Sequence, residues 1–170
     1  GLCEEGHFCP PGAASATAQP CGHPASYCLP GVGSPMWVVD GEVAVGGGPL
    51  TRSGKQECAP GHYCRQGMEV PCPPGRFGSE PGLKDPSCSG ECAAGWYCPE
   101  GSTREQARQC PDETVFCPAG SGHPSPVQAG YYTAGGRTSA EAGGFTHPAA
   151  RMECSATYGE LSALPTAHAK

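Results

Sequence analysis

The chain lacks isoleucine entirely, and the other large apolar residues that usually build a core are scarce. Leucine, valine and phenylalanine together number 18 of the 170 residues (6, 8 and 4). Burying all of them would stabilise a fold by roughly 1.5–3 kcal/mol each, whereas ordering the backbone costs about 1–2 kcal/mol per residue. This shortage excludes an ordinary globular domain built around one hydrophobic core.

Other absences narrow the classes of function. No apolar run approaches the ~20 residues of a membrane-spanning helix. No signal peptide is found, so we expect a mature piece or a segment of a longer secreted chain. The net charge of −6 includes no basic stripe, which argues against nucleic acid and against an anionic membrane surface as partners. Asparagine is absent, and with it the sequon for N-linked glycans.

Motifs for catalysis are missing as well. The sequence contains no G-x-S-x-G elbow, no phosphate-binding loop and no H-E-x-x-H motif. A nucleophilic cysteine would have to be unpaired and have a base beside it. The one obviously odd cysteine is Cys154, and His147 stands seven residues before it in a glycine-rich stretch. We therefore predict that the protein is not an enzyme and that it has no catalytic residue and no cofactor.

Cysteine, glycine and proline are abundant instead, with 13, 27 and 20 residues respectively. This composition is typical of small modules held by disulfides, each of which contributes roughly 2–4 kcal/mol by restricting the unfolded chain. Disulfides persist in oxidising compartments. We expect an extracellular protein, secreted or on the cell surface, made of tandem disulfide-rich modules of coil, turns and short β-hairpins, with little or no helix.

The cysteines form an internal repeat. Two quartets with the spacing C-x5-C-x11-C-x6-C lie 89 residues apart, and a quartet between them has the spacing C-x5-C-x7-C-x15-C. The members are Cys3, Cys9, Cys21 and Cys28; Cys58, Cys64, Cys72 and Cys88; and Cys92, Cys98, Cys110 and Cys117. Seven further identities keep the 89-residue register, from Gly31 matching Gly120 to Gly47 matching Gly136. Such self-similarity indicates a repeat architecture.

The repeat divides the chain into six segments. Cysteine-rich half-modules cover 1–35, 58–91 and 92–124; inter-module hairpins or linkers cover 36–57 and 125–153; a divergent tail covers 154–170. Cys154 aligns with Cys58 after an insertion of seven residues, and Glu160 then stands where Cys64 would have its counterpart. Strands are expected within the linkers, at 36–45 and 126–134, and a capped helical turn is expected at 102–109 in the third half-module.

A short element recurs around the second cysteine of each quartet: GHFCPPG (6–12), GHYCRQG (61–67) and GWYCPEG (95–101). His7 and His62 have a ligand-like spacing to the next cysteine, but Trp96 replaces them in the third copy. Cys88 and Cys92 are the nearest to the C-x2–4-C spacing of zinc sites, and no second such pair exists. We predict no metal site, and we interpret the rings as plates that pack over neighbouring disulfides.

Three segments carry a family resemblance: CPPGRFGSEPGLKDPSCSGEC (72–92), GHYCRQGMEVPCPPG (61–75) and GWYCPEGS (95–102). Here the chain resembles the ephrin-receptor-like cysteine-rich repeats, relatives of the tumour-necrosis-factor-receptor and EGF-like modules. Such repeats occur in arrays in extracellular proteins of algae and protists, including surface and flagellar-hair proteins. The resemblance covers residues 1 to about 136. It implies an elongated, disulfide-laddered rod or ectodomain with no catalytic residue.

The resemblance also implies a disulfide pairing, because related modules favour a crossed pattern within each quartet. The implied bonds are Cys3–Cys21, Cys9–Cys28, Cys58–Cys72, Cys64–Cys88, Cys92–Cys110 and Cys98–Cys117. For the middle quartet a second pairing stays open, in which Cys72 bonds to Cys88 across a CPPGRFG-type loop and Cys58 is left for Cys64. Cys154 would then be unpaired within the segment, or bonded to a cysteine of another chain or of a part of the protein outside it.

Two sets of surface residues are candidates for contacts and modification. Apolar and aromatic residues in the equivalent linkers are candidate interface residues: Trp37, Val38, Val39, Tyr131 and Tyr132. Ser34 and Pro35, and Ser125 and Pro126, are candidate sites for O-linked glycans or hydroxyproline, although such proline-rich joints can equally be stiff linkers.

These features favour an extracellular structural repeat protein, a subunit or segment of a surface filament, coat or flagellar hair. Its expected partners are neighbouring copies of the same chain, and glycans if the source attaches them. Neither nucleic acid nor direct membrane insertion is expected. The alternative is a receptor-like cysteine-rich ectodomain that binds a protein or glycan ligand.

Overall fold

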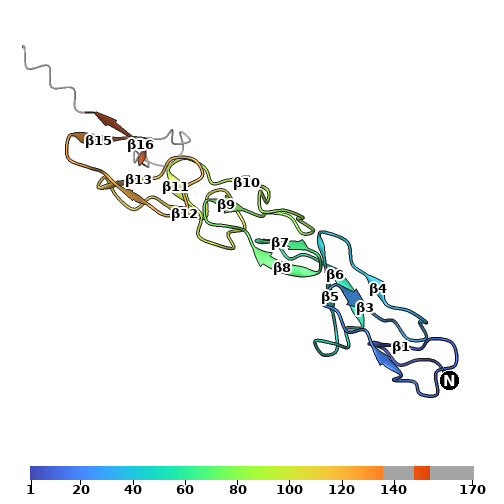
Figure 1. Ribbon diagram of the computed structural model, residues 1–170. Helices are drawn as coiled ribbons and strands as arrows, with labels where there is room; N and C mark the ends of the chain where they lie inside the picture. Colours follow the sequence, from blue (N-terminus) through green and yellow to red (C-terminus); the bar gives the residue numbers. More distant parts are fainter. Residues whose placement is uncertain (136–147, 154–170) are drawn as a thin grey trace, which may run out of the picture.

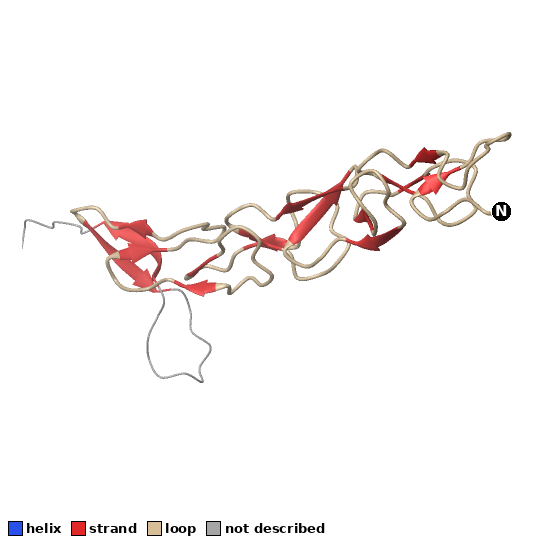
Figure 2. Cartoon of the chain, turned by 90° about the horizontal axis from the view of Figure 1, so that it is seen from below, coloured by secondary structure: helices blue, strands red, loops and turns tan. Residues whose placement is uncertain are grey.

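The structure, a computed structural model, describes residues 1–135 and 148–153. These residues form sixteen short β-strands and no helix, and the strands pair in chain order into eight antiparallel hairpins. The hairpins follow one another along an elongated rod, with the N-terminus at one end and β15 and β16 at the other (Figures 1 and 2). The expected fold class, small disulfide-rich modules with short β-hairpins, is confirmed.

Most strands are only two residues long, and the longest, β16, has six. The hairpins are β1 (His7–Phe8) with β2 (Gln19–Pro20), β3 (Ser26–Tyr27) with β4 (Met36–Trp37), β5 (Glu42–Val45) with β6 (Gly54–Glu57), β7 (His62–Arg65) with β8 (Met68–Pro71), β9 (Arg76–Phe77) with β10 (Gly90–Glu91), β11 (Trp96–Tyr97) with β12 (Arg108–Gln109), β13 (Val115–Phe116) with β14 (Ser125–Pro126), and β15 (Tyr131–Gly135) with β16 (Pro148–Glu153).

A tight turn leads into most of the first strands. In the turn over 73–76 the Arg76 amide donates to the Pro73 carbonyl at 3.1 Å, and Gly75 has a φ of +88°. Pro74 and Gly75 occupy the two central positions, where proline and glycine are the preferred residues of a type II turn. The local sequence thus reverses the chain before β9, without any contribution from a hydrophobic core.

The six disulfides are sequential, since each cysteine of a quartet bonds to its neighbour in the chain. The bonds are Cys3–Cys9, Cys21–Cys28, Cys58–Cys64, Cys72–Cys88, Cys92–Cys98 and Cys110–Cys117. Each bond encloses the first strand of one hairpin, or most of it. With closed loops this short, a disulfide stabilises its hairpin by about 2–3 kcal/mol in the chain-entropy account.

The crossed pairing that the family resemblance implied is therefore wrong in all three quartets. The turn after the first cysteine returns the chain within a few residues, so the partner Cα atoms in sequential pairs lie 5.6–6.1 Å apart, within the normal range for a disulfide. The third and fourth cysteines of a quartet flank the next hairpin instead. For the middle quartet, the pairing that stayed open in the sequence is the one observed.

Disulfides take the place of a conventional core. Ten of the twelve bonded cysteines are buried, and Cys9 and Cys88 are half-buried. The one cluster of other buried apolar residues within the described residues is small and lies in the first repeat, around β3 and β5: Ala25, Tyr27, Val38 and Ala44.

The strands expected in the linkers are present, but they do not pair with each other inside the stretches 36–45 and 126–134. The first stretch contains β4 and β5, which pair with β3 and β6. The second contains part of β14 and most of β15, which pair with β13 and β16. Each linker is thus shared between two successive hairpins.

The helical turn expected at 102–109 is wrong. Residues 102–107 form a loop that leads into β12. Backbone groups that a helix would use internally bond to other parts of the rod: the Glu105 carbonyl accepts from the Ala93 amide at 2.9 Å, and the Ser102 carbonyl accepts from the Gly78 amide at 2.9 Å. Tertiary hydrogen bonds override the local propensity of this segment.

Digestion with trypsin under non-reducing conditions tests the sequential pairing. Cleavage after Lys55 and Arg65 releases residues 56–65, which hold Cys58 and Cys64. We expect this peptide by itself, two hydrogen atoms lighter than its reduced form, because its disulfide is internal. Mass spectrometry that finds it joined to peptides 66–76 and 85–104 would contradict the structure, because the sequential bonds do not link it to either peptide.

Candidate functional site

The rod repeats one backbone feature, a glycine in the turn before a first strand. The turn glycines have φ angles between +76° and +94°. The amide of the residue after each glycine donates a hydrogen bond of 3.0–3.2 Å to the carbonyl of the residue two positions before that glycine. Such a positive φ is a left-handed conformation that glycine adopts without the steric cost of a Cβ. The turn glycines are Gly6, Gly41, Gly61, Gly75, Gly95 and Gly130.

The first five turn glycines also hold the next hairpin. The Gly75 carbonyl accepts from the Cys92 amide at 2.9 Å, and its own amide donates to the Cys98 carbonyl at 2.8 Å. We call a disulfide-closed segment such as 92–98 a knuckle, and the paired hydrogen bonds a glycine–knuckle contact. The other contacts join Gly6 to Cys21 and Cys28, Gly41 to Cys58 and Cys64, Gly61 to Cys72 and Gly78, and Gly95 to Cys110 and Cys117, all at 2.7–3.0 Å.

At four of the five glycine–knuckle contacts, those of Gly6, Gly41, Gly61 and Gly75, no side chain fits. A Cβ placed on Gly41 would lie 2.5 Å from the Gly82 carbonyl oxygen, and one on Gly61 would lie 2.5 Å from that of Gly101. Gly75 is equally obstructed, by the Gly120 carbonyl. The glycines therefore serve both the turn geometry and the close approach of two backbones. The contact is made by main-chain atoms. It joins one hairpin to the next and includes no side chain that could take part in a reaction.

The hairpin β5–β6 of the first repeat has a counterpart in β15–β16, and the two share their register. Ala44 lies opposite Lys55, as Thr133 lies opposite Arg151. In the first hairpin Lys55 Nζ lies 2.7 Å from Glu42 Oε1, and this hydrogen bond lowers the pKa of the Glu42 carboxyl. In the second, the Arg151 guanidinium lies 4.8 Å from the centre of the Tyr131 ring. A cation–π contact thus replaces an ion pair at the same corner.

The candidate interface residues of the first linker lie on opposite faces. Trp37 is 59% exposed and Val39 is 64% exposed, whereas Val38 is 9% exposed and belongs to the small core cluster. Successive side chains of an extended segment point to opposite sides, and the Val38 amide bonds to the Ala25 carbonyl at 2.9 Å. The prediction that Val38 is part of an exposed surface is therefore wrong. The Trp37 ring contacts the His23 ring, with 5.1 Å between their centres.

The second linker offers less apolar surface. Tyr132 is about half exposed, and its hydroxyl lies 3.6 Å from the Met152 sulfur on the facing strand. Tyr131 is half-buried beneath Arg151. These two tyrosines do not lie near Trp37. Trp37 belongs to β4, which is far along the rod from β15 (Figure 1).

The interpretation that the rings of the recurring element pack over disulfides stays a prediction. All six rings are half-buried: His7, Phe8, His62, Tyr63, Trp96 and Tyr97. The His62 Nδ1 lies 3.4 Å from the Pro60 carbonyl oxygen of its own turn. The sulfurs of Cys58 and Cys64 and a carboxylate oxygen of Glu69 lie within 4.8 Å of one another. The two sulfurs are bonded to each other, so neither is a thiolate ligand. The absence of a metal site stays a prediction.

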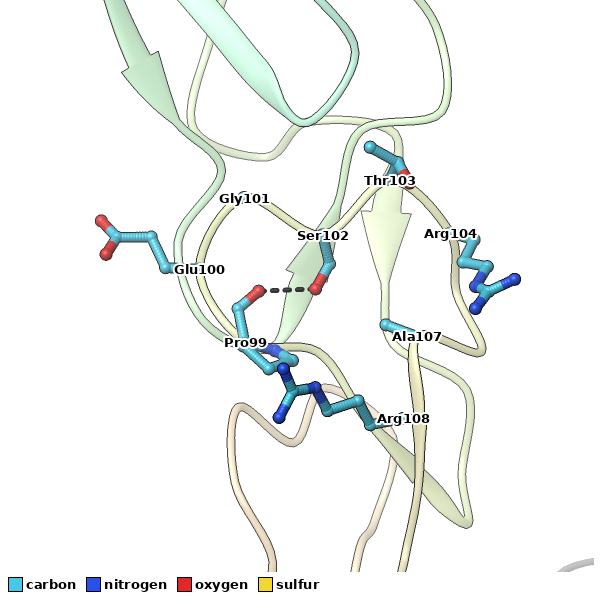
Figure 3. A pocket seen from close by; sticks show the side chains of 8 residues that line it. All are labelled: Pro99, Glu100, Gly101, Ser102, Thr103, Arg104, Ala107 and Arg108. Carbon is cyan, nitrogen blue, oxygen red and sulfur yellow. Dashed lines mark hydrogen bonds between the residues drawn. The ribbon is translucent and has the colours of Figure 1, made fainter.

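A hollow of about 270 Å³ lies on the loop between β11 and β12. Ser102 donates to the Pro99 carbonyl at 2.6 Å within it, while the guanidinium groups of Arg104 and Arg108 point in different directions (Figure 3). The corresponding loop of the first repeat, residues 10–19, contains no charged residue. A small-molecule site needs polar groups that converge on one ligand, and those of this hollow do not.

The candidate modification sites are partly accessible. Ser34 and Pro126 are exposed, whereas Pro35 and Ser125 are half-buried. Ser125 and Pro126 form strand β14, so this site belongs to a hairpin and is not a free linker. Cys154, the predicted unpaired or intermolecular cysteine, lies outside the described residues.

The sequence interpretation found Gly6, Gly61 and Gly95 in the recurring element but missed the contact that the turn glycines make with the next hairpin. Their signal in the sequence is a triplet that begins with glycine and has an aromatic residue or valine at its third position. The triplets that begin at the six turn glycines are GHF, GEV, GHY, GRF, GWY and GYY. The triplet recurs in linkers as well as in cysteine-rich segments. A search for this glycine triplet, and not only for cysteine spacing, would therefore have indicated the hairpin as the unit of repetition.

Substitution of a turn glycine tests the glycine–knuckle contact. We expect Gly75→Ala to lower the free energy of unfolding by roughly 2–5 kcal/mol, because it adds a left-handed alanine and a collision with the Gly120 carbonyl. Gly12→Ala is the matched control, with a φ of +86° and nothing within 4 Å of its Cβ, and it should cost only about 1–2 kcal/mol. Urea unfolding followed by circular dichroism measures both; equal losses would contradict the contact.

No protein-family model, curated protein or solved structure matches the chain. The resemblance to ephrin-receptor-like repeats therefore stays a prediction.

Proposed function

We propose that the protein is an extracellular structural repeat protein, a segment or subunit of a surface filament, coat or flagellar hair. The observation that carries this proposal is the way the rod is built. Each of five turn glycines bonds to the knuckle of the very next hairpin, so length grows by repetition along one direction. Structures whose units contact mainly their neighbours are quasi-one-dimensional and suit spacers and filaments.

The disulfides support an extracellular location. Six disulfides within 141 described residues fit a cysteine-rich extracellular protein, since such bonds persist where the environment is oxidising. None of the described residues belongs to a helix that could span a membrane. A rod exposed to the outside also needs resistance to proteolysis and local unfolding, which closed loops provide.

The partners that suit this function are further copies of the chain. Successive hairpins are joined by main-chain hydrogen bonds, and the polar groups of the hollow between β11 and β12 do not converge on one point, which favours stacking over the capture of a small ligand. Glycans at Ser34 or Pro126 would lie on exposed positions of the rod. Neither nucleic acid nor membrane lipid is a proposed partner.

Small-angle scattering and electron microscopy test the proposal. A compact domain of this length would have a radius of gyration of about 15 Å, and we expect the oxidised protein to exceed this clearly because its hairpins are arranged in a row. Immunogold labelling with an antibody against residues 1–35 should decorate a surface filament or coat in the native material. Labelling confined to the cell interior, or to dispersed monomers outside the cell, would contradict the function.

A receptor-like ectodomain is the second candidate, and the exposed indole of Trp37 favours it. The ring is 59% exposed beside His23 and near the exposed Val39. Aromatic rings that present a flat apolar face and a polar edge are frequent in binding surfaces.

Tryptophan fluorescence tests this second candidate. In a Trp96→Phe background, Trp37 is the one remaining indole, so a ligand that stacks on it should change its emission. We expect soluble oligosaccharides of the native cell surface to shift that emission, and expect Trp37→Ala to abolish their binding in calorimetry, if the receptor function holds. Leu50→Ala, which changes an exposed residue elsewhere, is the control. Equal binding by Trp37→Ala and Leu50→Ala would rule out this surface.

A further inference from the structure

One stretch of the rod carries no charge. Residues 6–39 contain no aspartate, glutamate, lysine or arginine, so the 10 basic and 16 acidic side chains of the chain all lie outside them. The two stretches 6–39 and 95–128, which the 89-residue offset relates, share their disulfide pattern and their hairpins. The fold therefore does not require the loss of charge, because the second stretch contains Glu100, Arg104, Glu105, Arg108, Asp112 and Glu113.

Apolar and aromatic side chains are exposed in the same uncharged stretch. Met36, Trp37 and Val39 are exposed, and the His23 ring lies against Trp37. We call these four side chains the uncharged face. The strand pair β13–β14 has the same register as β3–β4, yet the equivalent residues of the second repeat are of another kind: Asp112, Ser125, Pro126 and Gln128.

Neighbouring hairpins leave the uncharged face open. In the first repeat β5–β6 and β7–β8 follow it, and Trp37 and Val39 are exposed beside them. In the second repeat β9–β10 and β11–β12 precede the equivalent position, and Pro126 and Gln128 are exposed there as well. Neither the hairpins before this position nor those after it cover it.

The composition of the uncharged face is that of an interface. The centre of a protein interface is depleted in charged residues and enriched in aromatic residues and methionine, and exposed apolar patches mark sites of interaction. Because the second repeat builds the same strand pair with Ser125 and Pro126, the hairpin does not need Met36 and Trp37 in order to form. A contact with another molecule explains why the first repeat has them.

The uncharged face has few polar groups for a glycan. Of its four side chains that of His23 alone is charged or strongly polar apart from the indole N–H of Trp37, and its Nδ1 accepts a hydrogen bond from the Ala25 amide at 3.1 Å. A sugar ring presents several hydroxyl groups, and each loses hydrogen bonds to water when it is buried without a partner. An apolar protein surface has no such groups to satisfy, so a protein surface of the same kind is the better occupant.

We propose, resting on the filament function proposed above, that the uncharged face binds the uncharged face of a second copy of this chain. Two rods then associate side by side about a two-fold axis. Such an isologous contact needs a surface that complements itself, which an uncharged apolar surface does. The net charge of −6 opposes association elsewhere on the rod, whereas residues 6–39 bring no charged side chain to the contact.

Sedimentation velocity tests this pairing on the full, oxidised chain with Cys154→Ser, so that no disulfide through Cys154 contributes. We expect this parent protein to form dimers as its concentration rises. A face variant takes the residues of the second repeat, with His23→Asp, Met36→Ser, Trp37→Pro and Val39→Gln. The dissociation constant of its dimer should rise by about 30-fold or more, the loss expected when a tryptophan leaves the centre of an interface.

A matched control takes residues of the second repeat outside the uncharged face. Pro11→Glu, Ser15→Arg and Ala16→Glu change three exposed positions of the same half-module, and this control should dimerise like the parent. Unchanged disulfide maps establish that the variants fold. A parent that stays monomeric, or a face variant that dimerises as tightly as the control, overturns the pairing.

A charge exchange at Val39 tests whether the face binds itself. Val39→Glu and Val39→Lys should each dimerise more weakly than the parent, because each pairing buries two like charges near the axis. An equal mixture of the two variants should recover dimers, because opposite charges then meet. A face that binds some other surface of the second copy gives no recovery on mixing, and that result would refute the two-fold contact.

Transfer of the face to the second repeat is the reverse experiment. Asp112→His, Ser125→Met, Pro126→Trp and Gln128→Val give each rod two such faces. Association should become tighter than that of the parent or extend beyond dimers. Association unchanged from the parent would contradict the proposal.

Failure of the pairing is distinguishable from failure of the filament function. Monomers at every concentration overturn the pairing, and immunogold labelling of the native material then decides the filament function independently. Dimers that form with Cys154 intact and vanish with Cys154→Ser overturn the pairing and leave Cys154 as the link between chains. Monomers whose Trp37 emission shifts with oligosaccharides overturn it too, and assign the face to the receptor function.

Discussion

The rod depends on the meeting of a turn glycine with the knuckle of the following hairpin. Glycine is required there for two reasons, since the turn needs a positive φ and a carbonyl occupies the space of a Cβ. None of the six disulfides joins one hairpin to the next, so disulfides alone would give a string of independently closed loops. At five of the seven junctions between successive described hairpins, paired hydrogen bonds at 2.7–3.0 Å join one hairpin to the next and convert that string into a rod.

Disulfides and glycine contacts act on different states of the chain. The short disulfide loops reduce the entropy of the unfolded chain, which compensates for a core that has, in the described part of the chain, only four apolar residues besides cysteine. The glycine contacts act in the folded state, where each hydrogen bond contributes about 1 kcal/mol net and is protected by the buried cysteines beside it. Neither device requires isoleucine, leucine or any large apolar side chain.

Sequence reasoning succeeded where cysteine spacing carries the information and failed where backbone contacts do. The repeat of 89 residues and the tandem hairpin modules follow from the cysteines. The crossed pairing was wrong because a borrowed family pattern outweighed the local turns, such as Pro73–Arg76, that return the chain within each short loop. Val38 was misplaced because a run of apolar residues does not reveal which face is buried, and residues 102–109 were misread because the bonds to Ala93 and Gly78 are tertiary.

A contact made by main-chain atoms also explains which residues the repeats are free to change. His7 and His62 correspond to Trp96, and the ion pair of Glu42 and Lys55 corresponds to the stacking of Arg151 on Tyr131. These exchanges leave the glycine turn and the knuckle untouched, because the contact between them is made by main-chain atoms. A rod built on such interchangeable joints has specific contacts without a specific sequence at its surface. Successive hairpins therefore stack through the same main-chain contact even where the side chains of the two repeats differ.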